Sequence, residues 1–161
     1  LGSQIGLHWL NNRFELPYLR DSLLDRGIMI DTLETATTWT NLLPHYYAVQ
    51  DTLAHSLKEQ GTPAIVMCHL SHLYLEGASL YYTFIARQKA GKEIEQWEKA
   101  KKAATDVIVA HKGTLSHHHG VGYEHQPWLK KEISQTGYRM LKALKKELDP
   151  QNILNPEKLI H

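Results

Sequence analysis

The chain has 161 residues, 42% of them hydrophobic, and its 18 Lys and Arg against 17 Asp and Glu leave a formal net charge of +1. These values suit one globular domain with a core of its own and exclude disordered and low-complexity proteins. A near-neutral chain lacks the positive charge of nucleic-acid-binding proteins, and residues 65–74, the longest apolar stretch, are too short to span a membrane.

The first half of the chain predicts a helix, a strand and a second helix. Leucines near helical spacing indicate a short amphipathic helix over residues 16–26. A run rich in β-branched residues predicts a strand over 28–38. Thr40 is a suitable N-cap for a helix to about Gln60, in which apolar residues recur every three or four positions.

The second half predicts a hairpin, a helix, a short strand and a C-terminal helix. The strands of the hairpin cover residues 63–74 and 78–87, with a turn at Glu76-Gly77. The later elements are a helix over 93–112, a strand over 114–119 and a helix over 129–148.

This order of elements is typical of an α+β fold, the ferredoxin-like split βαβ arrangement. It predicts a four-stranded antiparallel sheet with two helices on one face, plus N- and C-terminal helical segments. The expected divisions are a helical lead-in over 1–27, a ferredoxin-like substrate or cap domain over 28–122 and a helical segment over 123–161. The uncovered face of the sheet is free to meet a ligand or another domain.

Cys68 is the single cysteine, so the sequence excludes internal disulfides and fits a reducing compartment, which predicts a cytoplasmic protein. The chain starts Leu-Gly-Ser-Gln, with no Met and no targeting signal. We therefore expect a fragment of a longer protein.

Three consecutive histidines, His117 to His119, precede a Gly-Val-Gly sequence. Alternation along a strand would put His117 and His119 on one side and His118 on the other. All three can face one site only if the strand ends or bulges near Gly120. An isolated histidine is more often structural, but three beside glycines favour proton exchange next to a flat cofactor or substrate.

His69 and His72 lie three positions apart in the first hairpin strand, and hence on opposite faces unless the strand bulges. They are therefore not expected to bind one metal ion, and no metal site is predicted.

Tyr81 and Tyr82 must point to opposite faces of their strand, one into the core and one toward the open face. A phenol beside imidazoles is a candidate general base, because cationic neighbours favour its ionised form. Glu34 needs a partner if it faces inward. Arg13, which precedes the first predicted helix, and Arg20, which lies within it, are on composition more often solvated surface residues.

Five segments together resemble the C-terminal domain of FAD-linked oxidases of the vanillyl-alcohol-oxidase type. Within that family they are most similar to the alkyldihydroxyacetonephosphate synthases and their bacterial relatives. The segments are RFELPYLRD (13–21), DTLETATTW (31–39), MCHLSHLYLEGASLYYTFIARQ (67–88), LSHHHGVG (115–122) and LDPQNILNPEKL (148–159). They cover nearly the whole chain in the right order, and the histidine triplet is the most specific of them.

The resemblance implies that FAD is bound mainly by a separate N-terminal domain of the same parent chain. This domain would be the substrate or cap domain that covers the flavin, and the isolated fragment would be inactive. The implied partners are that FAD-binding domain and a small-molecule or lipid-like substrate, with a possible homodimer. The implied reaction exchanges an acyl for an alkyl group on dihydroxyacetone phosphate, with no net change in the redox state of FAD.

The resemblance also assigns residues. Tyr81 matches the base that removes a proton from the substrate, Arg20 an arginine near its phosphate, and His117–His119 the triplet at the flavin. The whole expected set is catalytic Tyr81, His117, His118, His119 and Arg20; substrate-binding Arg13, Glu34 and His69; and cofactor-binding His118, His119 and Asn155.

Two other functions stay open at this point. One is an FAD-dependent oxidase or dehydrogenase of a 2-hydroxy acid or alcohol. That branch of the family binds a divalent metal, but Tyr81 and His118 stand near the places of two of its ligands, so the metal is not expected here. The other is a ferredoxin-like ligand-sensing module, which would not need Tyr81, Arg20 and the triplet at one point.

Overall fold

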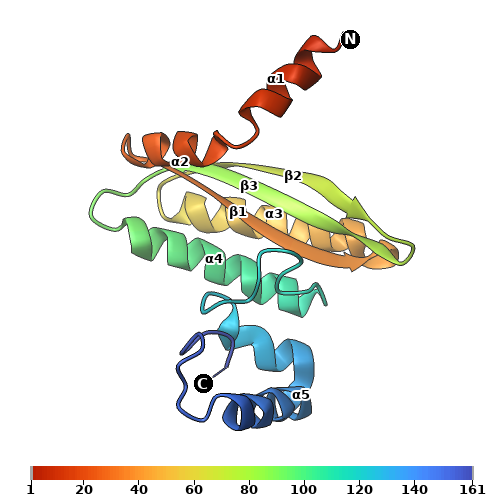
Figure 1. Cartoon of the computed structure of the whole chain (residues 1–161). Helices are drawn as coiled ribbons and strands as arrows, with labels where there is room; N and C mark the ends of the chain where they lie inside the picture. The colour runs from red at the N-terminus through yellow and green to blue at the C-terminus, as the bar shows by residue number, and fades with distance from the viewer. Residues whose placement is uncertain (1, 161) are drawn as a thin grey trace.

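The computed structural model describes residues 2–160 of the chain (Figure 1). Among these residues, no helix is both long and apolar enough to cross a membrane. The elements are α1 (Gln4–Asn12), α2 (Leu16–Leu24), β1 (Ile28–Thr38), a 3-10 turn (Trp39–Asn41), α3 (Leu42–Glu59), β2 (Ala64–Leu73), β3 (Gly77–Arg87), α4 (Glu93–Ala110) and α5 (Gln126–Leu148).

The three long strands form an antiparallel sheet in the order β1-β3-β2. Thr83 of β3 lies opposite Thr32 of β1 and Met67 of β2, which fixes the register across the sheet. Helices α3 and α4 cover one face of this sheet (Figure 1). The predicted α+β class, with helices on one face and helical segments at both ends, is confirmed.

The core lies between the sheet and these two helices. Alternate side chains of each strand point to this face, and Leu33, Tyr82 and Phe84 are fully buried there. Leu53 of α3 and Ala104 of α4 pack against them. Tyr81 therefore points to the open face and Tyr82 into the core, as the alternation predicts.

The fourth strand predicted over residues 114–119 is wrong, because these residues form a bent loop in the structure. The Thr114 N–H donates to the Ala36 carbonyl at 3.0 Å, which is where a strand at the β1 edge would begin. The chain then leaves the sheet, because Leu115 is buried in a second apolar cluster with Leu129 and Ile160. A carboxylate oxygen of Glu132 also accepts the Leu115 N–H at 3.1 Å.

Strand β2 bulges near its end. Its pairing with β3 jumps from Leu70 opposite Leu80 to Leu73 opposite Ala78, so two residues face Ser79. The hydroxyl of Ser79 accepts the His72 N–H at 3.1 Å. A bulge of this kind changes the side to which the following side chains point.

The ends of the chain are helical. Helix α1 extends away from the sheet at the N-terminus, and α5 lies beyond α4 near the C-terminus (Figure 1). Helix α5 contains a break at Ser134, whose φ and ψ are 68° and 167°.

Candidate functional site

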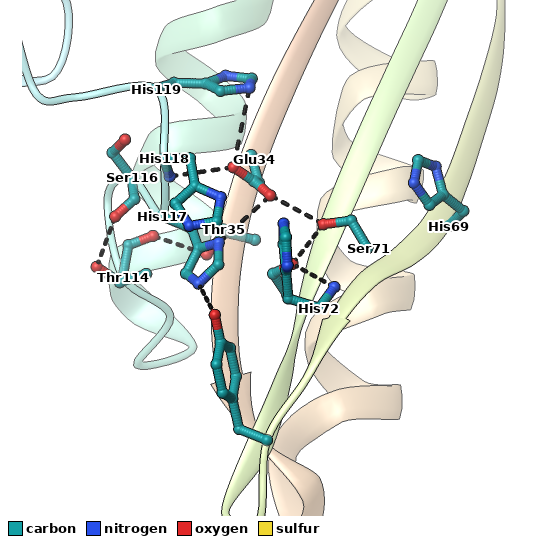
Figure 2. Close-up of polar contacts among 12 residues, drawn as sticks. Glu34, Thr35, His69, Ser71, His72, Thr114, Ser116, His117, His118 and His119 are labelled. Atoms are coloured by element: carbon teal, nitrogen blue, oxygen red, sulfur yellow. Dashed lines mark hydrogen bonds and ion pairs between the residues drawn. The ribbon is translucent and has the colours of Figure 1, made fainter. Parts of the chain in front are cut away.

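Glu34 is the centre of a polar cluster on the open face of the sheet (Figure 2). Its side chain is 3% exposed, and both carboxylate oxygens have partners. The Ser71 hydroxyl donates to Oε1 at 2.9 Å, and the His118 backbone N–H donates to Oε2 at 3.1 Å. The His117 Nδ1 lies 3.4 Å from Oε1 and the His119 Nε2 lies 3.8 Å from Oε2.

These donors hold Glu34 in its ionised form. Burial by itself raises the pKa of the carboxyl, but the hydrogen bonds from Ser71, the His118 N–H and His117 outweigh it, so the pKa lies below its ordinary value. A charged side chain is thus accommodated in a buried position, because each oxygen is satisfied by the protein.

The bulge in β2 brings Ser71 and His72 to this cluster. The Ser71 hydroxyl lies 2.5 Å from the Ser79 hydroxyl, so β3 supports the group that donates to Glu34. The His72 ring lies 4.5 Å from the His118 ring and 5.2 Å from the His117 ring, centre to centre.

All three histidines of the triplet reach the surroundings of Glu34. In an alternating strand His118 would point away, but the bent loop removes that alternation. The rings of His117 and His118 lie 4.0 Å apart. The site thus needs the chain to leave the sheet after Thr114, whereas the sequence placed the required end or bulge of the strand near Gly120.

The site could also hold a metal ion. Ligand atoms of Glu34, His72, His117 and His118 all lie within 4.8 Å of one another, and imidazole and carboxylate groups suit divalent transition metals. The argument against a metal assumed that His69 and His72 lie on opposite faces, and the bulge removes this assumption for His72. His69 itself lies apart from the cluster (Figure 2). The absence of a metal stays a prediction.

Tyr81 lies beside the cluster on the open face of β3. Its ring centre is 5.4 Å from that of His69 on one side and 5.4 Å from that of His119 on the other. In the sheet, Tyr81 lies opposite Glu34 of β1 and His69 of β2. The structure therefore brings together Tyr81, Glu34 and the histidine triplet, as expected, while His69 lies at the margin of the site beside Tyr81.

Three other expected site residues lie elsewhere. Arg20 is on α2, where its guanidinium is 3.8 Å from the Asp21 carboxylate. Arg13 stacks on its neighbour Phe14, and Asn155 accepts the Lys158 N–H with its backbone carbonyl. Across residues 2–160, the structure shows no contact between Arg20 and Tyr81, so the imidazoles are the candidate cations that face this phenol.

Sequence reasoning missed several residues of the site. Ser71, Tyr74 and Ser79 were not selected, and His72 was considered only as a metal ligand. The hydroxyl of Tyr74 lies 2.9 Å from Nε2 of His117. The signal that could have found these residues is the density of hydroxyl and imidazole groups in the hairpin, since one bulge can align them on one face.

The exposed groups of the loop fit the edge of a flat ring such as that of a flavin. His118 and His119 are exposed, and they offer ring nitrogens that can donate to carbonyl or ring-nitrogen acceptors. Gly120 and Gly122 follow with φ values of 81° and 53°, a conformation that glycine adopts without strain. This bend exposes bare backbone beside the imidazoles.

The protein is thus an α+β domain in which helices cover one face of an antiparallel sheet and a cluster of histidine, tyrosine and carboxylate groups lies on the other. A family model described as FAD linked oxidases, C-terminal domain, matches residues 6–159. The chain therefore belongs to this family, whose cofactor is FAD.

The similar proteins include synthases and oxidoreductases of this family. An alkyldihydroxyacetonephosphate synthase of Dictyostelium discoideum is 41% identical over 160 residues, which cover 99% of this chain and 26% of that protein. The synthase of Trypanosoma brucei brucei is 39% identical over the same shares. A solved structure of an alkyldihydroxyacetonephosphate synthase superposes with a TM-score of 0.65 at 33% identity, over 92% of this chain and 24% of that one.

The chain spans about a quarter of the length of the curated relatives that it matches. In those proteins, the region similar to this chain is one part of a longer polypeptide. The resemblance found in the sequence is confirmed at the level of the family and of its most similar members.

Proposed function

We propose that this chain is the substrate domain of an FAD-dependent enzyme that exchanges the acyl group of an acyl-dihydroxyacetone phosphate for an alkyl group. The observation that carries the proposal is Tyr81, placed on the open face between the rings of His69 and His119. The similarity to two alkyldihydroxyacetonephosphate synthases over 99% of the chain supports it.

Tyr81 acts as the base in this proposal. The substrate carbon that carries the acyl group is next to a ketone, so its hydrogen is acidic enough for a positioned phenolate to remove. The imidazoles of His69 and His119 lie beside this phenol, and imidazoles are groups that can exchange protons with it. FAD, when bound, would supply a ring that accepts electron density from the activated carbon, and the exposed His118 and His119 would be the residues of this chain that hold its edge.

Glu34 positions the triplet and does not touch the substrate. Its carboxylate binds the His118 N–H and faces His117 and His119, so it orients three imidazoles at once. Because Glu34 is buried and paired, the loop keeps its shape while the exposed rings meet substrate and cofactor.

The remaining expectations belong to the same proposal. The FAD-binding domain would be part of the same polypeptide and would dock on the open face of the sheet. Residues 28–122 would form the cap over the flavin, with 1–27 and 123–161 as flanking segments. Arg20 would meet the phosphate of the substrate, and Arg13 and Asn155 would bind substrate and cofactor, once this second domain is in place. The proposed enzyme is cytoplasmic and forms a homodimer.

Oxidation of a 2-hydroxy acid is the second candidate function. The favouring observation is the set Glu34, His72, His117 and His118, whose spacing could hold a divalent metal that binds such an acid. Against it, a metal ion would have to share the Glu34 carboxylate with the hydrogen bonds that its oxygens accept from Ser71 and His118.

Assays of the full-length protein separate the two functions. We expect release of fatty acid from acyl-dihydroxyacetone phosphate and formation of the alkyl product in the presence of a fatty alcohol. Tyr81→Phe should lower turnover by about 10² to 10⁴, the usual cost of losing one positioned proton acceptor, with FAD content unchanged. Tyr47→Phe removes the same hydroxyl from an exposed position on α3 and should have no effect. Bleaching of the flavin by 2-hydroxy acids, without fatty acid release, would overturn the proposal.

A further inference from the structure

Tyr74 forms a hydrogen-bonded chain with His117 and Glu34. The Tyr74 hydroxyl lies 2.9 Å from Nε2 of His117, and the other ring nitrogen, Nδ1, lies 3.4 Å from Oε1 of Glu34. If Nδ1 carries the proton toward the carboxylate, Nε2 accepts the phenolic proton of Tyr74. A carboxylate, an imidazole and a hydroxyl in this order form a proton relay.

We propose that Tyr74 is a second proton-transfer residue of this site, with His117 as the proton acceptor behind it and Glu34 as the positioning residue. The solvent-exposed fraction rises along this hydrogen-bonded series, from 3% at the Glu34 side chain through 14% at the His117 side chain to 49% at Tyr74. The charged carboxylate of Glu34 is therefore shielded from water, and the Tyr74 phenol is accessible to a ligand on the open face of the sheet.

The backbone of the hairpin fixes the phenol in place. The Tyr74 N–H donates to the Gly77 carbonyl at 2.8 Å, and the Trp39 indole N–H donates to the Tyr74 carbonyl at 3.1 Å. Gly77 itself cannot carry a side chain, because a Cβ would lie 2.0 Å from the Thr37 carbonyl oxygen. The turn that presents Tyr74 is thus closely packed against the end of β1.

Tyr81 and Tyr74 differ in their surroundings. The neighbours of Tyr81 are the rings of His69 and His119, and within residues 2–160 its hydroxyl has no hydrogen-bond partner. The hydroxyl of Tyr74 has such a partner in His117. The two phenols thus lie beside different imidazoles, which suits two proton transfers in one reaction.

This inference rests on the proposed function, which contains two deprotonations. In the first, the substrate carbon loses a proton to Tyr81. The bond between that carbon and the acyl oxygen breaks, and the fatty acid leaves as a carboxylate with the bonding electrons. In the second, the incoming alcohol loses its O–H proton while its oxygen forms the new ether bond. We assign this second proton to the relay: it passes to the Tyr74 oxygen as the Tyr74 proton passes to Nε2 of His117, which later releases it to water. Tyr81 then returns the proton that it took to the substrate carbon, which ends with its original two hydrogens.

The charges around His117 support this role. Glu34 faces it from β1, His72 and Tyr74 face it from β2 and its end, and His118 follows it in the loop. Because the pKa of Glu34 is held low, its carboxylate is charged at neutral pH, and one of its oxygens faces Nδ1 of His117 at 3.4 Å.

The test compares two rates in the full-length enzyme. One is exchange of the substrate's carbon-bound hydrogen with D2O in the absence of alcohol, and the other is formation of the alkyl product. We expect Tyr74→Phe to lower product formation by about 10² or more while hydrogen exchange stays within about twofold, since loss of a group that takes the proton directly costs about 10² to 10⁴. Tyr81→Phe should lower both rates, and Tyr47→Phe neither.

A second measurement separates a relay from a structural role. Fluorinated fatty alcohols give up their proton more readily, so they should restore much of the lost rate in Tyr74→Phe, but add little in the wild type. Glu34→Gln should show the same rescue by fluorinated alcohols, because it removes the carboxylate that positions His117 for the relay. The flavin spectrum of each variant reports folding.

The outcomes are distinct. If the wild type forms no alkyl product, the proposed function fails and the relay fails with it. If the wild type is active and Tyr74→Phe forms product at the wild-type rate, only the relay fails. The relay is also wrong if the rate lost in Tyr74→Phe is the same for fluorinated and ordinary alcohols, since Tyr74 would then have a structural role.

Discussion

A single buried carboxylate organises the residues of this site. Burying an ionised glutamate without partners would cost several kcal/mol, and a buried charge is stable only when it is paired and hydrogen-bonded. Here Ser71, His117, His118 and His119 surround the carboxylate of Glu34. The buried carboxylate needs these partners, and its contacts with them hold the imidazoles in place. The exposed loop has no comparable group of its own to do this.

His45 shows the opposite behaviour at the residue scale. It is fully buried on α3, neither ring nitrogen has a hydrogen-bond partner, and burial lowers its pKa to about 4. The folded protein therefore holds His45 neutral, while the unfolded chain takes up a proton below its ordinary pKa of 6.5. The contribution of His45 to the free energy of unfolding is fully present above pH 6.5 and is lost as the pH drops toward 4.

From this shift we expect His45 to remove about 2 kcal/mol of stability between pH 7 and pH 5. Urea denaturation of the wild type and of His45→Leu at both pH values measures this change. The free energy of unfolding should fall less between pH 7 and pH 5 in the variant than in the wild type. The control is His55→Leu, because His55 is exposed on the same helix, where it pairs with Glu59. Equal pH dependence in wild type and His45→Leu would contradict the assignment.

At the scale of elements, the residue pattern of a segment predicts those helices and strands that depend mainly on that segment's own residues. The β-branched run 28–38 forms β1 with the predicted bounds, and the helices after Thr40 and from Glu93 form where their apolar periodicity places them. The bulge at Ser71 and His72 and the loop over 114–119 were not predictable in this way. Both depend on distant partners, the Ser79 hydroxyl in one case and the burial of Leu115 against Leu129 in the other.

The same distinction applies to the site. The alternation of Tyr81 and Tyr82 and the histidine motif predict which groups face the sheet, and the resemblance to a family adds their roles. The surroundings of Glu34 could not be predicted, since Ser71 and His72 reach it only through the bulge. Arg20 was expected beside Tyr81, but in the described residues its partner is Asp21 on the same helix.

Gly113 connects α4 to the histidine loop, and we expect Gly113→Ala to destabilise the protein by about 1 to 3 kcal/mol, the usual cost of overpacking. A Cβ there would lie 2.1 Å from Cε1 of His45 and 2.8 Å from Oγ1 of Thr35. His45 is fully buried, so it cannot move aside easily. Urea denaturation measures the loss, and activity should fall as well because the histidine loop starts here.

The matched control for this prediction is Gly6→Ala. Nothing lies within 4 Å of the Cβ that alanine would add at this position of α1. Alanine favours a helix over glycine by up to about 1 kcal/mol, so this variant should be as stable as the wild type or slightly more stable. A similar loss in both variants would show that packing around Gly113 is not the cause.

At the scale of the whole molecule, large apolar side chains are exposed on the open face and on the N-terminal helices. Ile65 and Met67 of β2 are exposed, and so are Trp9 of α1 and Phe14 after it. Contiguous exposed apolar surface marks an interaction site in soluble proteins. In the proposed enzyme, the FAD-binding domain covers this surface, which agrees with the chain spanning about a quarter of its relatives.

We therefore expect the isolated 161 residues to retain little or no FAD, in contrast to the full-length protein. The groups that this chain offers to a flavin are the exposed rings of His118 and His119 and the glycine bend after them, which contact a ring edge. The phosphates of FAD need backbone N–H donors such as those of a glycine-rich loop at a helix N-terminus. We expect these donors from the other domain.

Visible absorbance of bound flavin after desalting measures the retained cofactor in both proteins. The isolated chain should be colourless, and it should bind a hydrophobic dye that the full-length protein excludes, because Ile65, Met67 and Trp9 would then lack their cover. Circular dichroism of the isolated chain checks that its helices are formed. Stoichiometric yellow flavin on a folded isolated chain would show that this domain binds the phosphates itself, and the proposed division of FAD binding between two domains would have to be given up.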